Sequence, residues 1–190
     1  MYLFFDTETT GIPRNYKAAV SDLQNWPRLV QLAWLLIDDE AHEVASAEYI
    51  ARPVGFTIPV DAARIHGITT EIAAAKGVDI GTILDAVMPD IGKASVLVAH
   101  NMSFDEKILG AELLRAGRPN VVESRKRQCT MQGATDYCGL PGQYGYKWPT
   151  LQELHTKLFK EPFEGAHRAL VDVRACARCY FELRRLKVMA

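Results

Sequence analysis

The sequence has no long apolar run and no strong excess of charge, and both deficits narrow the classes of protein that it can encode. None of its apolar stretches approaches the roughly 20 residues that a membrane-spanning helix needs. The apolar run after Met1 covers only residues 2–5 and has no basic leader, so it does not predict a signal peptide. We therefore expect a cytoplasmic protein with no membrane partner.

The formal net charge of −1 excludes a protein that is basic over its whole surface. Nucleic acids are bound largely by Lys and Arg side chains that face phosphates, so a nucleic-acid partner would need a local basic patch. The charged runs at 125–127 and 184–187 are candidates, although short runs of this kind are more often solvated surface.

Only four cysteines are present, and their spacing favours reduced, structural thiols. Cys176 and Cys179 form a C-x-x-C pattern in the middle of a predicted helix, whereas a redox pair opens a helix. Cys129 and Cys138 are separated by eight residues, unlike a zinc knuckle. Disulfides and a zinc site are therefore the less favoured interpretations.

Hydrophobic residues make up 48% of the chain and charged residues 24%, which is typical of one soluble domain over residues 1–190. Apolar runs predict strands at 2–6, 29–37, 43–51, 95–99 and around 121–122. Helical spacing predicts helices at 60–66, 79–93, 103–116, 150–159 and 169–188. Loops are predicted at 12–27 and, around a short helix, at 132–149. A hairpin followed by strand–helix alternation predicts an α/β fold, with a mixed sheet between helices.

Two acidic residues follow the first predicted strand. Asp6 and Glu8 are two residues apart, so both side chains point to the same face of the strand. An acidic residue at the end of a strand is often only the start of a loop. The pair alone therefore does not decide between a loop and a site.

A third acidic residue, Asp105, ends the motif His-Asn-x-x-Phe-Asp at 100–105. Ser103 and Glu106 fit a capping box, and an acidic residue in the first turn of a helix is favoured by the helix dipole. The predicted helix also begins at the carboxyl edge of a strand, where open α/β sheets bind ligands. Asp105 can serve both roles, whereas the capping box alone explains Glu106.

The last acidic motif contains His167 and Asp172, which are five residues apart. On one helix they would be separated by about 140° and would not share a face. Gly165 and Ala166 favour a loop that presents the histidine, with Asp172 just inside the following helix. A histidine can accept a proton from water near neutral pH, although a single loop histidine is more often plain surface.

The three acidic motifs indicate a function only when they are taken together. Four converging carboxylates repel one another unless cations lie between them, and they suit two Mg²⁺ or Mn²⁺ ions in phosphodiester cleavage. Their order resembles that of the DEDDh 3′–5′ exonucleases, the group that contains the proofreading epsilon subunit of bacterial DNA polymerase III. The resemblance covers residues 2 to about 180, and it extends to the segments at 5–11, 58–59, 65–69 and 150–154.

The resemblance implies a ribonuclease-H-like fold, with a five-stranded mixed sheet flanked by helices. It also implies two Mg²⁺ or Mn²⁺ ions bound by the four acidic residues and a general base that accepts the proton of the attacking water. The catalytic set is Asp6, Glu8, Asp105, His167 and Asp172. The expected product is a nucleoside 5′-monophosphate released from the 3′ end of a nucleic acid.

The same resemblance implies residues that hold the terminal nucleotide. Backbone groups of Thr9 and Gly11 are expected to approach the 3′ hydroxyl, and Ile12 to separate the last two bases. His66 is expected to contact the nucleotide, and Asn101 to support the third acidic residue. For Ile12 and His66, ordinary packing is the alternative.

Aromatic residues in the second loop, at positions 144, 146 and 148, are candidates for stacking on exposed bases. In a glycine-rich loop, aromatic side chains more often anchor the loop to the core. That anchoring is the favoured alternative here.

We expect DNA to be the favoured substrate, as in proofreading, with single-stranded 3′ ends as the partner and a DNA polymerase subunit as a further candidate partner. The alternative is an exoribonuclease that trims RNA or short oligoribonucleotides, and the insertion at 16–26 is a candidate determinant of this choice. Less favoured hypotheses are an inactive nucleic-acid-binding module and a hydrolase of small phosphodiesters.

Overall fold

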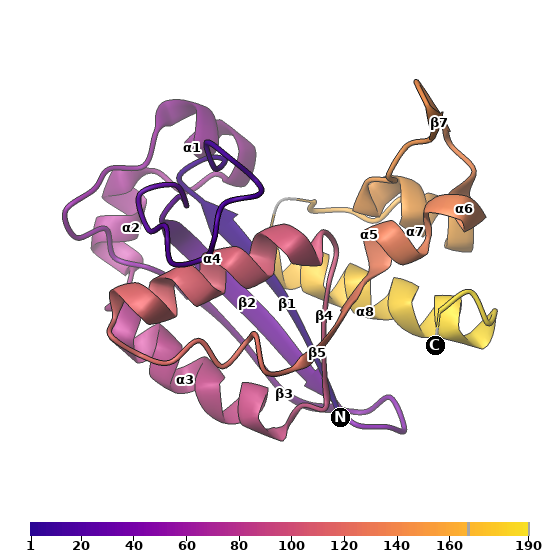
Figure 1. The fold of residues 1–190 in the computed structure, drawn as a ribbon, viewed down its shortest axis with the longest axis horizontal. Helices are drawn as coiled ribbons and strands as arrows, with labels where there is room; N and C mark the ends of the chain where they lie inside the picture. Colours follow the sequence, from indigo (N-terminus) through magenta and orange to yellow (C-terminus); the bar gives the residue numbers. More distant parts are fainter. Residues whose placement is uncertain (167, 190) are drawn as a thin grey trace.

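The computed structural model describes residues 1–166 and 168–189. Its main sheet has five strands in the order β3-β2-β1-β4-β5. Their bounds are β1 Tyr2–Thr9, β2 Leu29–Ile37, β3 Glu43–Ile50, β4 Val96–Ala99 and β5 Lys126–Cys129. β1, β2 and β3 pair antiparallel, whereas β4 pairs parallel with both β1 and β5. The prediction of a five-stranded mixed sheet is therefore confirmed (Figure 1).

The helices are α1 Val60–His66, α2 Thr70–Lys76, α3 Ile80–Lys93, α4 Met102–Arg115, α5 Thr130–Gly133, α6 Thr135–Cys138, α7 Leu151–Phe159 and α8 Ala169–Arg185. A small hairpin, β6 Pro141–Gly142 and β7 Gly145–Tyr146, projects beside α6 (Figure 1). The helix α2 was not predicted from its short alanine-rich sequence.

Alternation along β1 divides the core between the two faces of the sheet. Leu3 and Phe5 pack in one cluster with the buried side chains of α3 and α4. Phe4 points the other way and packs against Tyr180 of α8. Because side chains alternate along a strand, the residues that follow on β1 are also shared between α4 and α8.

The fifth strand lies later in the chain than predicted. The apolar pair Val121–Val122 belongs to a turn, where Val122 is fully buried in the core. The strand is the polar segment Lys126–Cys129, which pairs with Val96–Ala99. An edge strand with two exposed residues has no apolar pattern, so the prediction followed the buried turn instead.

The predicted capping box of α4 is also wrong. Asn101 has a left-handed backbone (φ 82°) and starts the helix at Met102, so Ser103 is already inside it. Glu106 instead forms an ion pair of 2.7 Å with Arg127 on β5. The chain does contain a capping box, at the start of α7 between Thr150 and the residue three positions later.

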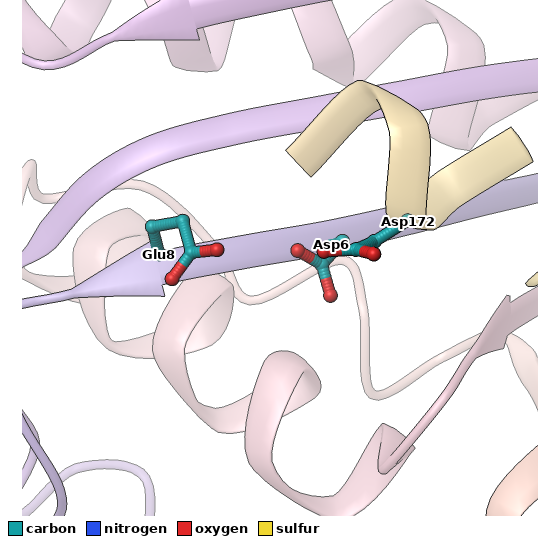
Figure 2. A group of neighbouring side chains, drawn as sticks. All are labelled: Asp6, Glu8 and Asp172. Atoms are coloured by element: carbon teal, nitrogen blue, oxygen red, sulfur yellow. The ribbon is translucent and has the colours of Figure 1, made fainter. Parts of the chain in front are cut away.

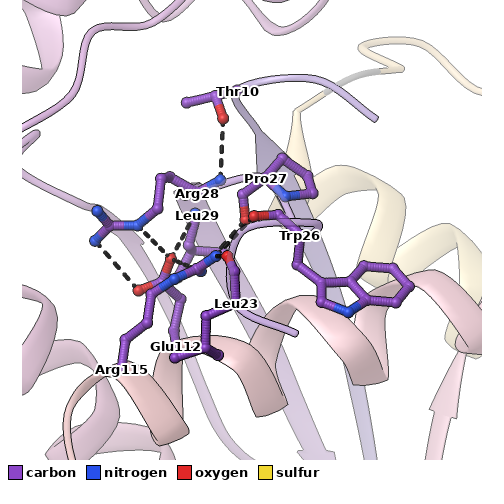
Figure 3. A network of polar contacts seen from close by, with 8 residues as sticks. All are labelled: Thr10, Leu23, Trp26, Pro27, Arg28, Leu29, Glu112 and Arg115. Carbon is purple, nitrogen blue, oxygen red and sulfur yellow. Dashed lines mark hydrogen bonds and ion pairs between the residues drawn. The ribbon is translucent and has the colours of Figure 1, made fainter. Parts of the chain in front are cut away.

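A buried ion network fixes the segment that connects β1 and β2 (Figure 3). The carboxylate of Glu112 on α4 is only 1% exposed and accepts hydrogen bonds from Arg28, Arg115 and the Leu29 N–H. Arg115 also donates to the carbonyls of Leu23 and Trp26. The Arg115 guanidinium therefore holds the end of the insertion. The Glu112 carboxylate that binds it also holds the start of β2.

The four cysteines are free thiols, and Cys176 and Cys179 are buried on α8. Within the described residues, no helix is both long enough and apolar enough to cross a lipid bilayer.

We expect Glu112→Ala to lower the free energy of unfolding by about 3–5 kcal/mol, because two guanidinium groups would lose their buried partner. Denaturant unfolding followed by circular dichroism measures this change. Glu182→Ala is the matched control, since it removes an ion pair on the surface of α8 and should cost less than about 1 kcal/mol. A loss below 1 kcal/mol for Glu112→Ala would contradict the structural role of the network.

Candidate active site

The acidic residues of β1 lie beyond the end of its parallel neighbour. β4 pairs with β1 only as far as Phe4, whereas β1 continues beside β2 to Thr9. Asp6 and Glu8 share the face of Phe4, and this is the face that α8 covers. The sheet therefore leaves one edge of β1 open where its two carboxylates emerge.

Three of the predicted acidic residues converge at this edge. Asp172 lies in the first turn of α8. Its carboxylate oxygen and those of Asp6 and Glu8 lie within 4.8 Å of one another (Figure 2). Segments more than 160 residues apart thus bring three oxygen ligands together, which is the kind of donor set that Mg²⁺ and Mn²⁺ prefer.

The third of the predicted acidic residues in chain order, Asp105, approaches from the other face of β1. It lies in the first turn of α4 and is 3% exposed. Its Oδ1 accepts hydrogen bonds from the Thr7 N–H (3.1 Å) and the Thr7 hydroxyl (2.7 Å). Thr7 points toward α4 because the two acidic residues that flank it on the strand point the other way. It therefore fixes the Asp105 carboxylate beside these two residues.

The electrostatics of the cluster favour a bound cation. Burial and the nearby Asp172 raise the pKa of Asp6 to about 7. Burial, Asp6 and Asp172 raise the pKa of Glu8 to about 8. The pKa of Asp105 is also well above its ordinary value, because of burial and the charge of Asp6. A divalent ion would reverse these shifts, since it favours the ionised form of every carboxylate that it contacts.

A pocket of about 340 Å³ adjoins Glu8 and contains most of the predicted nucleotide-binding residues, among them Thr9, Gly11, Ile12 and His66. Gly11 has φ +145°, which L side chains rarely adopt, and its carbonyl accepts a hydrogen bond from the Thr9 hydroxyl (2.6 Å). Ile12 is 74% exposed, so packing does not explain it.

His66 is buried at the wall of this pocket. Its Nδ1 accepts a hydrogen bond from the Ile68 N–H (3.1 Å), so in the neutral ring Nε2 carries the proton. Burial lowers the pKa of His66, which favours that neutral ring, although the Thr9 backbone opposes the shift. Among the described residues, Nε2 has no hydrogen-bond partner of good geometry, since the Thr9 backbone satisfies it only weakly. A buried donor that lacks a partner is suited to a ligand.

Asn101 lies at the start of the helix that carries Asp105, and its predicted support of that residue stays a prediction. Its left-handed conformation begins α4, and its carbonyl accepts a hydrogen bond from the Phe104 N–H (2.9 Å). Its side-chain oxygen accepts a hydrogen bond from the Ser103 hydroxyl (3.1 Å). His167, the predicted general base, lies outside the described residues, so its role stays a prediction.

The structure also assigns contacts to His100, for which the sequence predicted no separate role. Its Nδ1 lies 2.9 Å from the Thr130 hydroxyl, and its Nε2 lies 3.0 Å from the Pro149 carbonyl. Burial lowers the pKa of His100 to about 4, so the ring is neutral. These partners are 30 and 49 residues away, and no local pattern could have revealed them.

The aromatic residues of the loop at 132–149 do not anchor it to the core. The exposed fractions of Tyr144, Tyr146 and Trp148 are 94%, 59% and 61%. The favoured sequence interpretation of these residues is therefore wrong, and contact with a ligand stays open to them.

The fold and the site together define the class of protein. A mixed five-stranded sheet whose central strand carries clustered carboxylates is the arrangement of a ribonuclease-H-like nuclease that uses divalent metal ions. Residues 3–180 match the family model RNase_T, described as Exonuclease, and the chain belongs to this family. The identification made from the sequence motifs is thereby confirmed at the level of the family.

Solved structures of exonuclease I share this fold. E. coli exonuclease I in complex with a dT13 oligonucleotide is 21% identical with a TM-score of 0.76, over 98% of this chain and 42% of that chain. Another exonuclease I structure is 19% identical, with a TM-score of 0.78, over the same shares of the two chains. A moderately thermophilic exonuclease I from Methylocaldum szegediense is 20% identical, with a TM-score of 0.73, over 97% of this chain and 40% of that chain. The chain thus spans about two-fifths of these relatives.

No curated protein sequence matches the chain significantly.

In metal-free buffer, we expect the unfolding temperature to fall as the pH rises from about 5 to 8.5. Asp6 and Glu8 keep their protons in the folded state up to about pH 7 and 8, whereas in the unfolded chain they lose them near pH 4. The stability that protonation supplies is therefore present at low pH and is lost through this window. Scanning calorimetry in EDTA measures the decline.

Asp6→Asn is the matched control for this decline, because it removes one of the titrating charges and should flatten the curve. Adding Mn²⁺ should raise the unfolding temperature of the wild type more at pH 8.5 than at pH 5.5, since the ion competes with protons. Equal slopes for the wild type and Asp6→Asn would contradict the assignment.

Proposed function

We propose that this chain is a metal-dependent 3′–5′ exonuclease that releases nucleoside 5′-monophosphates from single-stranded 3′ ends, with DNA favoured over RNA. The observation that carries the proposal is the convergence of Asp6, Glu8 and Asp172 within 4.8 Å, beside a pocket of nucleotide size. Membership of the Exonuclease family supports the same reaction.

In this proposal, Asp6, Glu8, Asp105 and Asp172 hold two Mg²⁺ or Mn²⁺ ions. Bound there, the ions supply an activated water and stabilise the departing 3′ oxygen. β1 positions its own two carboxylates. Thr7 fixes Asp105, and Asp172 lies on α8. His167 accepts the proton of the attacking water.

The pocket beside Glu8 holds the terminal nucleotide. The backbone at Thr9 and Gly11 approaches the 3′ hydroxyl, and the exposed Ile12 separates the last two bases. The Nε2–H of His66 donates to the nucleotide, which satisfies a buried donor that lacks a partner of good geometry. Asn101 keeps the helix that carries Asp105 at the edge of the site.

DNA is favoured because the solved relatives of this fold include E. coli exonuclease I bound to dT13 and to dA16 oligonucleotides. Trimming of RNA is the competing substrate choice, since recognition of a 2′ hydroxyl depends on a few contacts with the sugar. The proposed reaction does not require a polymerase partner, which stays an expectation from the resemblance to the epsilon subunit.

We expect wild-type protein with Mg²⁺ to shorten a 5′-labelled single-stranded DNA from its 3′ end, faster than an RNA of matched sequence, and EDTA to stop the reaction. Denaturing electrophoresis over time gives both the direction and the sugar preference. Asp172→Asn should lower the rate by at least about 10³-fold, because it removes a charged metal ligand.

His167→Ala should lower the rate by about 10²–10⁴-fold and still bind Mn²⁺, as expected for a general base. Glu106→Gln, which alters the ion pair between α4 and β5, is the control that should remain active. Cleavage that survives in Asp172→Asn would exclude the proposed metal site.

A further inference from the structure

We propose that Trp148 and the pocket that it lines form a second nucleotide-binding site, which stacks on an unpaired base of the substrate. This inference rests on the proposed function and extends it. The site lies on the side of the carboxylates away from the pocket of Thr9 and Ile12. Figure 1 shows the corresponding elements, the β6–β7 hairpin and α1, on either side of the upper end of the sheet.

The second pocket has a volume of about 500 Å³, which is sufficient for a nucleotide. Its lining is largely apolar and includes Met131, Trp148 and Phe163. Asp6 and Asp172 line the same pocket, so it is continuous with the carboxylate cluster. A nucleic-acid strand that is held at the proposed metal site therefore has direct access to this second pocket.

The chain on both sides of Trp148 is anchored, although 61% of the residue is exposed. On one side, the Lys147 N–H donates to the Leu140 carbonyl (2.9 Å), and the Lys147 ammonium pairs with Glu153 (2.6 Å). On the other side, the capping box of α7 fixes Thr150. An exposed aromatic side chain on an anchored backbone loses little backbone freedom on binding, and aromatic residues are typical contact residues.

His100 links this segment to the strand that carries the active site. The Pro149 carbonyl accepts a hydrogen bond from its Nε2–H, and its Nδ1 accepts one from the Thr130 hydroxyl, an assignment that the neutral ring requires. His100 directly follows β4 and precedes the residue that begins α4. The position of Trp148 is therefore coupled through one partly buried side chain to the helix that carries Asp105.

The chemistry of the pocket selects a base over the other parts of a nucleic acid. Among the described residues, its lining contains no Lys or Arg to pair with a phosphate, whereas the face of an indole stacks on any base. A base inside a duplex has both faces covered by its neighbours, so only an unpaired base can stack there. The occupant is thus a nucleotide of a single-stranded or frayed substrate.

Intrinsic fluorescence tests the inference, because Trp26 and Trp34 are only 3% and 2% exposed. The probe is a short oligothymidylate whose 3′ linkages are phosphorothioates that resist cleavage, added with Mg²⁺. We expect it to quench the exposed tryptophan and to protect it from acrylamide. A blunt duplex of the same length should do neither, and Trp148→Phe should lose the signal because the two buried tryptophans remain unchanged.

Kinetics supply the second readout. Trp148→Ala should raise KM for single-stranded DNA about tenfold and leave kcat within about twofold. Trp148→Phe keeps an aromatic face and should restore KM close to that of the wild type. Val44→Ala, which shortens an exposed side chain on the far edge strand β3, is the control for general surface effects.

The outcomes separate this inference from the proposed function. If the wild type cleaves single-stranded DNA but shows no quenching, and Trp148→Ala has an unchanged KM, the second site is excluded and the exonuclease stands. If the wild type cleaves neither DNA nor RNA, the proposed function fails. In that case quenching by the oligothymidylate upholds the base-stacking site, and its absence excludes that site as well.

Discussion

Repulsion among carboxylates at the end of β1 is the constraint on which the rest of the structure depends. Three acidic side chains lie within 4.8 Å of one another, and a fourth is buried next to them. Burial and like charge both disfavour ionisation, as the raised pKa values of Asp6 and Glu8 show. The fold must therefore hold these groups together against their own electrostatics until cations offset the repulsion.

Two helices on opposite faces of one strand provide that support. β1 alternates its side chains, so its carboxylates face α8 while Thr7 faces α4 and receives Asp105. Glu112 lies seven residues after Asp105, two turns along the same face of α4, and binds the start of β2. One helix face thus fixes both Asp105 and the start of β2.

The parts of the fold that were predictable are those with a strong local pattern. The apolar run 29–37 matches β2 to the residue, and the two-residue spacing of Asp6 and Glu8 correctly placed both on one face. The order of the acidic motifs identified the family, because few folds place that combination in that sequence.

The errors occurred where contacts between distant segments decide the structure. β5 is polar and exists because it pairs with β4, which no local pattern could show. Asn101 adopts a left-handed conformation that shifts the start of α4 and replaces the expected capping box. His100 and Trp148 acquire their significance from partners brought together by the fold, and the role of His167 stays a prediction.

The most direct test of the account is to locate metal ions by anomalous diffraction from crystals grown with Mn²⁺ near pH 8. The account predicts two peaks between β1, α4 and α8, at the carboxylates of Asp6, Glu8, Asp105 and Asp172. An absence of manganese at these carboxylates, in crystals that retain the fold described above, would contradict it.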